Sequence, residues 1–448
     1  MLSLETASAC VQALIERARR AGADAADAVI GADMSQSVSV RLGKLEDVER
    51  SESEHISLRA FVGQRSASIG SSDLSDAALD ELAARAVAMA RLAPEDAYAG
   101  LAPGDMLLSG PFADLDGVDP AEPSPAQLRA QAEEAEDAAR AVAGVTNSEG
   151  GSAGAGRGLF ALATSHGFAG AYATTSRSLS ASVVAGEGSA MQRDYAWRTA
   201  HHGADLPGAA EIGSLAGSRA VARLGPGRVK SGPMAIVFDP RVGGTLIGHL
   251  VGAMAGPSIA RRSSFLLDRL EEELFDNAVV IADDPLRRRG LRSRAFDGEG
   301  LATSPRNLVE QGRITGWLLD SASARQLGLA PTGHAARGHG GAPGVGTGNL
   351  HLAAGSVTPA ELMADIADGI YVTELIGMGV NGVTGDYSRG ASGYRIVGGE
   401  IAGPVAEFTI AGNLLDMFRA LTPADDLEWH RAVNVPTIRV DGMMVAGD

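Results

Sequence analysis

One stretch of the chain combines the features of a catalytic strand–turn–helix unit with a single histidine. The apolar run PMAIVF and the turn DP lead into RVGGTLIGHLVGAMAG, residues 241–256, which has His249 near its centre. A catalytic zinc ion takes about three His, Asp, Glu or Cys ligands and keeps one position open for water. Neither HExxH nor HExxxH occurs here, because Leu250 follows the histidine and Ala253 lies four residues beyond it. From these residues alone we expect a structural histidine on an Ala/Gly/Leu-rich helix.

Three further histidines lie in a glycine-rich region and could in principle ligate a metal. His334, His339 and His351 fall within 18 residues, at spacings of five and twelve that match no metal motif. A glycine-rich loop also holds ligands poorly, so we expect a surface loop, with a metal site as the alternative. The histidine pair at 201–202 ends an expected strand, where adjacent side chains point to opposite faces, and is expected to be structural.

The other motifs give no catalytic constellation. The chain has no GxSxG nucleophile elbow, and the runs GAGRG and GVGTG fit neither a dinucleotide-binding nor a P-loop pattern. The carboxylate pairs Asp283–Asp284 and Asp297/Glu299 have no partner constellation, so we expect them in turns, facing solvent. The basic run LRRRGLRSR at 286–294 is flanked by acidic residues and is expected to be a solvated loop.

The elements that would position these residues alternate between helices and antiparallel strands. Helices are predicted over 3–21 and 74–94, with strands and glycine turns between them. Residues 95–125 are rich in Pro, Gly and Asp, which predicts a linker, and a second helix–strands–helix unit follows. Beyond residue 234 hairpins dominate, so we expect an α+β fold with mixed, mainly antiparallel sheets and flanking helices. The predicted units are an N-terminal domain over 1–94, the linker over 95–125, a middle domain over 126–230 and a strand-rich C-terminal domain over 231–448.

Composition narrows the class of protein. The 448 residues are 45% apolar and 21% charged, which is typical of a soluble globular protein. The net charge of −17 argues against a nucleic-acid partner, because phosphate binding needs clustered Lys and Arg. Cys10 is the only cysteine, which excludes an intrachain disulfide and a Cys-rich metal site. The N-terminus lacks a signal-peptide pattern and no run approaches the roughly 20 apolar residues of a membrane span. We therefore expect a cytoplasmic protein without a membrane partner.

Three blocks of sequence together resemble one known family. KLEDVERSESEHISLRAFVGQRSASIGSSDLSDAAL is similar to the opening domain of the TldD/PmbA family. NLVEQGRITGWLLDSASARQLGLAPTGHAAR and ASGYRIVGGEIAGPVAEFTIAGNLLDMF resemble two later blocks, and all three occur in the family's order. The resemblance covers nearly the whole chain. The family that the chain resembles also carries an older label, modulator of DNA gyrase.

The resemblance also implies which of the family's two kinds of subunit this is. TldD-type chains carry HExxxH in the strand–turn–helix unit; its histidines and a later cysteine hold zinc, and its glutamate is the general base. On this chain the ligand positions fall on Gly248 and Ala253 and the base position on His249. The cysteine would lie near DLEWHRAVNVP, which contains none. This implies a PmbA (TldE)-type chain, with no catalytic, cofactor-binding or metal-ligating residue of its own.

The favoured interpretation is a non-catalytic subunit of a cytoplasmic zinc metalloprotease. It would form a heterodimer with a TldD-type catalytic subunit that carries the zinc, and act on unfolded or small peptides such as leader segments. Exposed strand edges could bind such peptides by adding them as a strand. Two alternatives stay open: a homodimeric binding or scaffold protein, and a hydrolase whose metal site is relocated to His334, His339 and His351.

Overall fold

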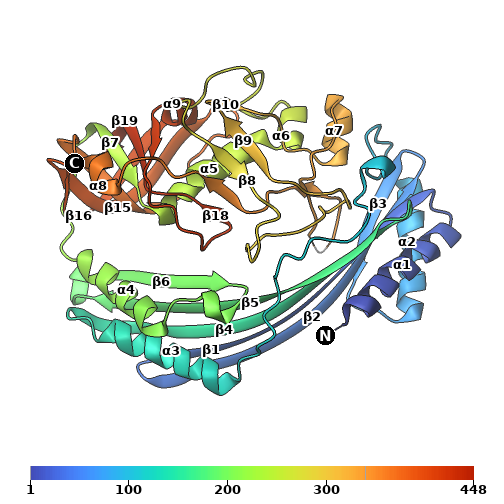
Figure 1. Ribbon diagram of the computed structural model, residues 1–448, viewed down its shortest axis with the longest axis horizontal. Coiled ribbons are helices and arrows are strands. Elements are labelled where there is room, and N and C mark those ends of the chain that lie inside the picture. Colours follow the sequence, from blue (N-terminus) through green and yellow to red (C-terminus); the bar gives the residue numbers. More distant parts are fainter. Residues whose placement is uncertain (1, 339) are drawn as a thin grey trace.

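The N-terminal half of the chain forms one antiparallel sheet of six strands. The computed structural model describes residues 2–338 and 340–448, and the strands of this sheet lie in the order β3-β2-β1-β4-β5-β6. Figure 1 shows it as a long curved layer beneath the C-terminal half of the chain. The strands are β1 (Ala25–Arg41), β2 (Lys44–Val62), β3 (Arg65–Ser71), β4 (Val145–Thr164), β5 (Ala169–Ala185) and β6 (Gln192–Ala200).

Four helices cover one face of this sheet. Ala26 and Ile30 of β1 pack beneath the first two helices, and Val38 packs beneath the other two. Ser3 and Ser75 cap the first two with their hydroxyl groups, as is usual for serine at a helix start. The helices predicted over 3–21 and 74–94 are confirmed as the first two of these, and their ends differ from the prediction by less than one turn. The four are α1 (Leu4–Arg20), α2 (Asp76–Leu92), α3 (Pro125–Arg140) and α4 (Ala209–Ala222).

The opposite face of the sheet carries small polar residues along its middle. Because side chains alternate along a strand, serines of β1 and β5 lie on either side of glycines of β4 on this face. A Cβ added at Gly154 would lie 2.8 Å from the Ser178 hydroxyl, so glycine is what lets the two strands carry serine there. This part of the sheet face therefore carries only small, mainly polar side chains. The neighbouring rows are Ser37, Gly154 and Ser178, and Ser35, Gly156 and Ser176.

The segment between α2 and α3 ties the sheet to the C-terminal half. The amide of Thr175 donates to the carbonyl of Gly117 at 2.9 Å, and the amide of Leu108 donates to the carbonyl of Gly300 at 2.9 Å. β1 and β4 also pair along most of their length, so strands from the predicted N-terminal and middle domains share one sheet. The domain boundaries at 94, 125 and 230 stay predictions.

The C-terminal half contains two larger sheets and a small one. In the first, pairing between β16 and β19 closes the order β16-β15-β14-β7-β19 on itself, with β17 added to β19. The second has the order β10-β9-β8-β13-β18. The strands of the first sheet are β7 (Gly232–Phe238), β14 (Asp368–Ile376), β15 (Asp386–Val397), β16 (Glu400–Asn413), β17 (Leu421–Pro423) and β19 (Ile438–Ala446). Those of the second are β8 (Ile281–Asp283), β9 (Arg306–Glu310), β10 (Arg313–Ile314), β13 (Leu350–Leu352) and β18 (Val433–Asn434).

Short elements complete this half of the chain. β11 and β12 pair with each other as a small two-stranded sheet, and the helices pack around the two larger sheets. The hairpins expected beyond residue 234 include β9–β10, which turns at Gly312, and β15–β16, which turns at 398–400. The helices are α5 (Pro240–Met254), α6 (Gly256–Ala260), α7 (Ser321–Leu327), α8 (Pro359–Met363) and α9 (Leu414–Arg419), and the two strands are β11 (Ala335–Ala336) and β12 (Gly344–Val345).

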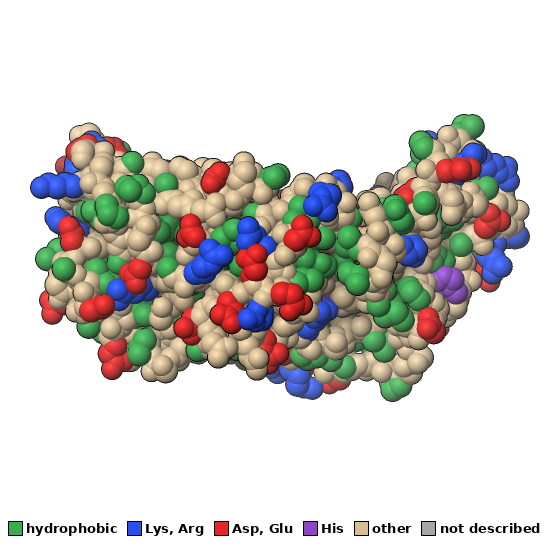
Figure 2. All heavy atoms as spheres, turned by 90° about the horizontal axis from the view of Figure 1, so that it is seen from above, with side chains coloured by type: hydrophobic (Ala, Val, Ile, Leu, Met, Phe, Trp, Pro, Cys, Tyr) green, Lys and Arg blue, Asp and Glu red, His purple; other side chains and the backbone are tan. Residues whose placement is uncertain are grey.

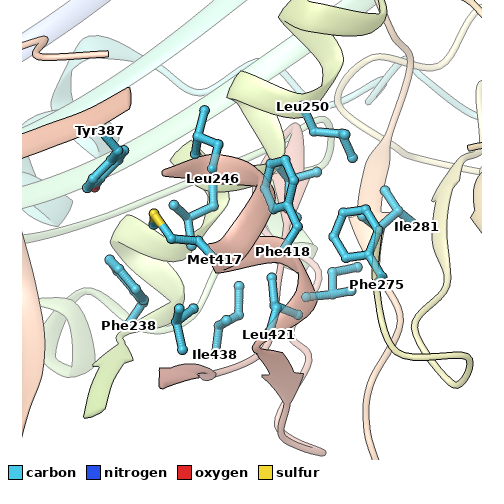
Figure 3. Packing of buried hydrophobic residues seen from close by; sticks show 14 of the residues in the cluster. Phe238, Leu246, Leu250, Phe275, Ile281, Tyr387, Met417, Phe418, Leu421 and Ile438 are labelled. Carbon is cyan, nitrogen blue, oxygen red and sulfur yellow. The ribbon is translucent and has the colours of Figure 1, made fainter. Parts of the chain in front are cut away.

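The largest core lies between α5 and the closed sheet. Leu246 and Leu250 of α5 lie in one buried cluster with Phe238, Phe418 and Ile438 (Figure 3). The predicted α+β class, with mainly antiparallel sheets and flanking helices, is confirmed. None of the helices in residues 2–338 and 340–448 has the length and apolar character needed to cross a membrane.

Candidate functional site

The strand–turn–helix unit singled out in the sequence is β7 followed by α5. The Asp239 carboxylate accepts the amide hydrogen of Arg241 at 2.8 Å, and Pro240 takes the first helical position, which together fix where α5 starts. One face of α5 is buried in the core, while Gly248 and Gly252 on another face are exposed. The helix is therefore held by its apolar side, and its exposed side carries no side chains at these two positions.

The positions that the resemblance gives for zinc ligands have no donor atoms. Gly248 is exposed, and a Cβ added there would meet no heavy atom within 4 Å. Ala253 is only 6% exposed and packs in the core instead. Within the described part of the chain, no group of three or more His, Cys, Asp or Glu residues is arranged to hold a metal ion. The residues present therefore do not fit a catalytic zinc, and no step through a metal follows for this chain.

His249, at the base position, makes the contacts of a packing residue. Its ring lies edge-on to Tyr387, with 6.2 Å between the ring centroids. Its Nε2 atom is buried and has no hydrogen-bond partner in the described structure. Burial, and next the positive charge of Arg389, lower the pKa of His249, so the imidazole is neutral at pH 7. Burial also raises the pKa of Tyr387 to about 12. The pair forms an uncharged contact between α5 and β15.

The segment where the resemblance places the ligand cysteine carries bulky and basic side chains. It packs directly on α5, because a Cβ added at Gly244 would lie 3.5 Å from a methyl group of Val433. Asn434 closes the loop before β18: its side-chain oxygen accepts the amides of His430 and Arg431 at 3.0 and 2.9 Å. Trp429 is 39% exposed. Sequence reasoning gave these residues no role beyond the lack of a cysteine, because nothing in the local sequence indicates that they lie together.

The three histidines of the glycine-rich region have separate surroundings where the structure describes them. His334 is 4% exposed, with its Nε2 atom 3.4 Å from a carboxylate oxygen of Asp283, so the expectation of a surface loop is wrong at this residue. His351 lies on β13, half-buried against Trp429, with 4.7 Å between ring centroids. His339 lies outside the described residues. The structure thus gives His334 a buried carboxylate and His351 an aromatic ring as neighbours.

Three of the carboxylates expected to face solvent are buried, so that prediction is wrong for Asp283, Asp297 and Glu299, while Asp284 is partly exposed. Asp283, Asp297 and Glu299 are 2%, 1% and 3% exposed. Asp297 accepts three backbone amides, including that of Ala335, and Glu299 accepts both the amide and the hydroxyl of Ser321. Burial raises the pKa of both groups. They serve as acceptors for backbone donors in tight turns, which a linear sequence does not reveal.

The basic run at 286–294 is a loop with Arg288, Arg289 and Arg292 exposed, as predicted, but the run also contacts distant segments. Arg289 forms ion pairs with Asp116 and Asp205, and His201 lies 3.0 Å from the carbonyl of Gly290 through Nε2. Arg287 stacks on Trp429, with its guanidinium carbon 3.4 Å from the ring centroid. The run therefore joins the end of β6 to the segment beside α5.

Comparison with protein families agrees with this architecture. Three domains described as parts of a PmbA/TldA metallopeptidase match this chain: domain 1 over 26–90, the central domain over 118–224 and the C-terminal domain over 231–447. Fold and family models together define a chain of metallopeptidase architecture, in which the resemblance gives Gly248 and Ala253 as the ligand positions.

Individual relatives give the same family. Metalloprotease PmbA of Escherichia coli O157:H7 is 37% identical over 426 residues, covering 95% of this chain and 92% of its own. A PmbA homolog of Haemophilus influenzae is 34% identical and covers 97% and 94%. A Bacteroides thetaiotaomicron structure described as a proposed modulator of DNA gyrase aligns over 100% of both chains, with a TM-score of 0.92 and 26% identity. TldE from Thermococcus kodakarensis shares the fold, with a TM-score of 0.85, 20% identity, and 98% and 100% coverage. The chain therefore belongs to the PmbA/TldD metallopeptidase family.

Proposed function

We propose that this chain is the non-catalytic subunit of a cytoplasmic TldD/TldE-like zinc metalloprotease that cleaves unfolded or small peptides. The observation that carries the proposal is the state of α5. The helix keeps its cap and its buried face, yet its ligand positions hold Gly248 and Ala253 and its base position holds a neutral imidazole. A zinc-bound water needs ligands to hold the ion, so the zinc belongs in a TldD-type partner.

Peptide binding is supported by an open strand edge. Residues 44–54 of β2 pair with β1 on one side, while β3 pairs only with the part of β2 that begins at Ile56. Among the described strands none pairs with the other edge of this stretch, and its first ten residues are exposed. An extended peptide can add to such an edge through backbone hydrogen bonds, which read little sequence. A folded protein presents few free strands, so unfolded chains are preferred.

The proposal is tested by combining the purified chain with the TldD-type subunit from the same genome. Cleavage of an unfolded fluorogenic peptide and the mass of the complex are measured for each chain alone and for the mixture. We expect a heterodimer, and cleavage that chelation of zinc abolishes. His249→Gln in this chain should leave the cleavage rate unchanged, because the imidazole holds no ion and packs on Tyr387. Cleavage by this chain alone would contradict the proposal.

The homodimeric scaffold alternative gives a different result in the same experiment. It predicts that this chain forms a homodimer, that the homodimer stays intact when the TldD-type subunit is added, and that the activity of that subunit does not change. The relocated metal site predicts that the isolated chain binds zinc and that His334→Ala releases it.

A further inference from the structure

A small cavity lies where the end of β6, the basic run at 286–294 and the segment before β18 meet. Its volume is about 190 Å³. Because liquid water occupies about 30 Å³ per molecule, this is room for about six waters, or for one side chain. Pockets for larger ligands run from about 300 to 1,000 Å³. Its lining includes Arg198, Arg287, Arg288, Arg289, Trp429 and Arg431.

Three of these arginines lack a close carboxylate. Arg287 and Arg431 form no ion pair within the described part of the chain, and the pair of Arg198 is a 3.8 Å contact to the exposed Glu428. Arg288 and Arg289 differ, because Asp116 and other acidic side chains neutralise them. On the molecular face in Figure 2, by contrast, basic and acidic side chains are interspersed. The cavity therefore carries excess positive charge in a protein whose net charge is −17.

Aromatic rings hold the unpaired guanidinium groups in place. Arg287 lies 3.4 Å from the ring centroid of Trp429, and Arg431 lies 4.9 Å from that of Trp197. Stacking of this kind fixes the plane of an arginine while its remaining N–H groups can donate. The Nε of Arg431 already donates to Nε2 of His430 at 3.1 Å, which leaves the terminal nitrogens of that guanidinium group for a ligand. Burial lowers the pKa of both arginines, and burial with the nearby arginines lowers the pKa of His430 to about 4. His430 therefore adds no charge at pH 7, and the positive charge belongs to fixed arginines.

We infer that this cavity binds a carboxylate of an extended peptide, either an acidic side chain or a free C-terminus. The inference rests on the proposed function, since it names a chemical preference of the peptides that this chain binds. Arginine pairs with carboxylates through short, charge-assisted hydrogen bonds, and a planar fork suits the two carboxylate oxygens. Asn434, which lines the cavity, is next in sequence to Val433, and Val433 packs against Gly244 of α5, so the cavity lies close to the segment that contacts this helix.

The test compares three labelled peptides of one extended sequence by fluorescence anisotropy. The first contains one Glu and an amidated C-terminus, the second replaces Glu by Gln, and the third has Gln and a free C-terminal carboxylate. Each is titrated with the full chain, alone and in complex with the TldD-type subunit. We expect one or both carboxylate peptides to bind about tenfold more tightly than the neutral one, a difference of about 1.4 kcal/mol, because hydrogen bonds to a charged group are stronger than those to a neutral amide. Which of the two binds tighter identifies the source of the carboxylate.

Variants of the cavity assign the preference to its arginines. Arg287→Gln and Arg431→Gln should each reduce the preference, and together abolish it, while affinity for the neutral peptide stays the same. Arg395→Gln is the matched control, because Arg395 lies in an exposed ion pair with Asp368. High salt should weaken the preference as well.

The outcomes separate this inference from the proposed function. Equal binding of all three peptides, or a preference that survives the double variant, overturns the carboxylate site and leaves peptide binding intact. Tighter binding of inorganic phosphate than of the carboxylate peptides, lost in the double variant, also overturns it. Failure of every peptide to bind, with or without the TldD-type subunit, overturns both.

Discussion

Asp27→Asn should destabilise the protein far more than the loss of an exposed ion pair. The Asp27 side chain is 2% exposed and pairs with Arg59 of the same sheet and Arg337 of the C-terminal half, which are 7% and 2% exposed. Arg59 Nε donates to a carboxylate oxygen of Asp27 at 2.9 Å. Asparagine has nearly the same shape, so the change removes mainly the charge. Arg59 then keeps only Glu299, at 3.8 Å, as an ion-pair partner, and Arg337 keeps none among the described residues. Removing one partner of a buried ion pair costs about 3–5 kcal/mol.

The assay is urea unfolding followed by tryptophan fluorescence, with Asp368→Asn as the control. The Asp368–Arg395 pair is 46% and 47% exposed, so its loss should cost about 0–1 kcal/mol. The two arginines lower the pKa of Asp27 in the folded chain. Its contribution to stability is therefore complete above the ordinary value of 3.8 and is lost as the pH falls through the lower folded pKa. The variant and the wild type should converge in strong acid. A midpoint for Asp27→Asn equal to that of the control at pH 7 would refute the reasoning.

Three further predictions concern close packing, helix propensity and histidine ionisation. Gly213→Ala should lower the unfolding midpoint, because its Cβ would lie 2.0 Å from the Ala135 carbonyl oxygen and force α3 and α4 apart. Gly248→Ala, on the exposed face of α5, should raise stability by about 0.5–1 kcal/mol, because alanine is the better helix former and no atom lies within 4 Å. The same urea assay checks both, and a stabilised Gly213→Ala would contradict the packing. His430 should titrate near pH 4 in an NMR experiment, since burial and nearby arginines oppose its protonation; a midpoint near 6.5 would show that the cluster is not assembled.

Much of the fold could be predicted from local patterns. The helices that start at Ser3 and Ser75 and the hairpin turning at Gly312 have strong local signals: a capping serine, apolar periodicity, or a glycine between alternating segments. The sharing of one sheet by β1 and β4 was not predictable, because that pairing joins segments more than 100 residues apart in sequence. Periodicity identifies a strand, and it says nothing of which distant strand lies beside it.

The candidate site was also predictable only in part from the sequence. The resemblance to the family gives Gly248 and Ala253 as the positions of the zinc ligands, and the residue types show that neither carries a donor side chain. The burial of Asp297 was not, because its partners are backbone amides of its own turn and of β11. The cavity that joins Arg287 to Arg431 was also beyond sequence reasoning, since the two lie in segments that only the tertiary fold brings together.

The most direct test of the central claim is the zinc content of the isolated chain. The chain is expressed without a metal-binding tag, purified in buffer that contains zinc, freed of loosely bound ions, and analysed for zinc per polypeptide by elemental analysis. We predict a value near zero, because the positions at 248, 249 and 253 provide no ligand set and no alternative cluster is present among residues 2–338 and 340–448. A value near one zinc per chain would contradict the account.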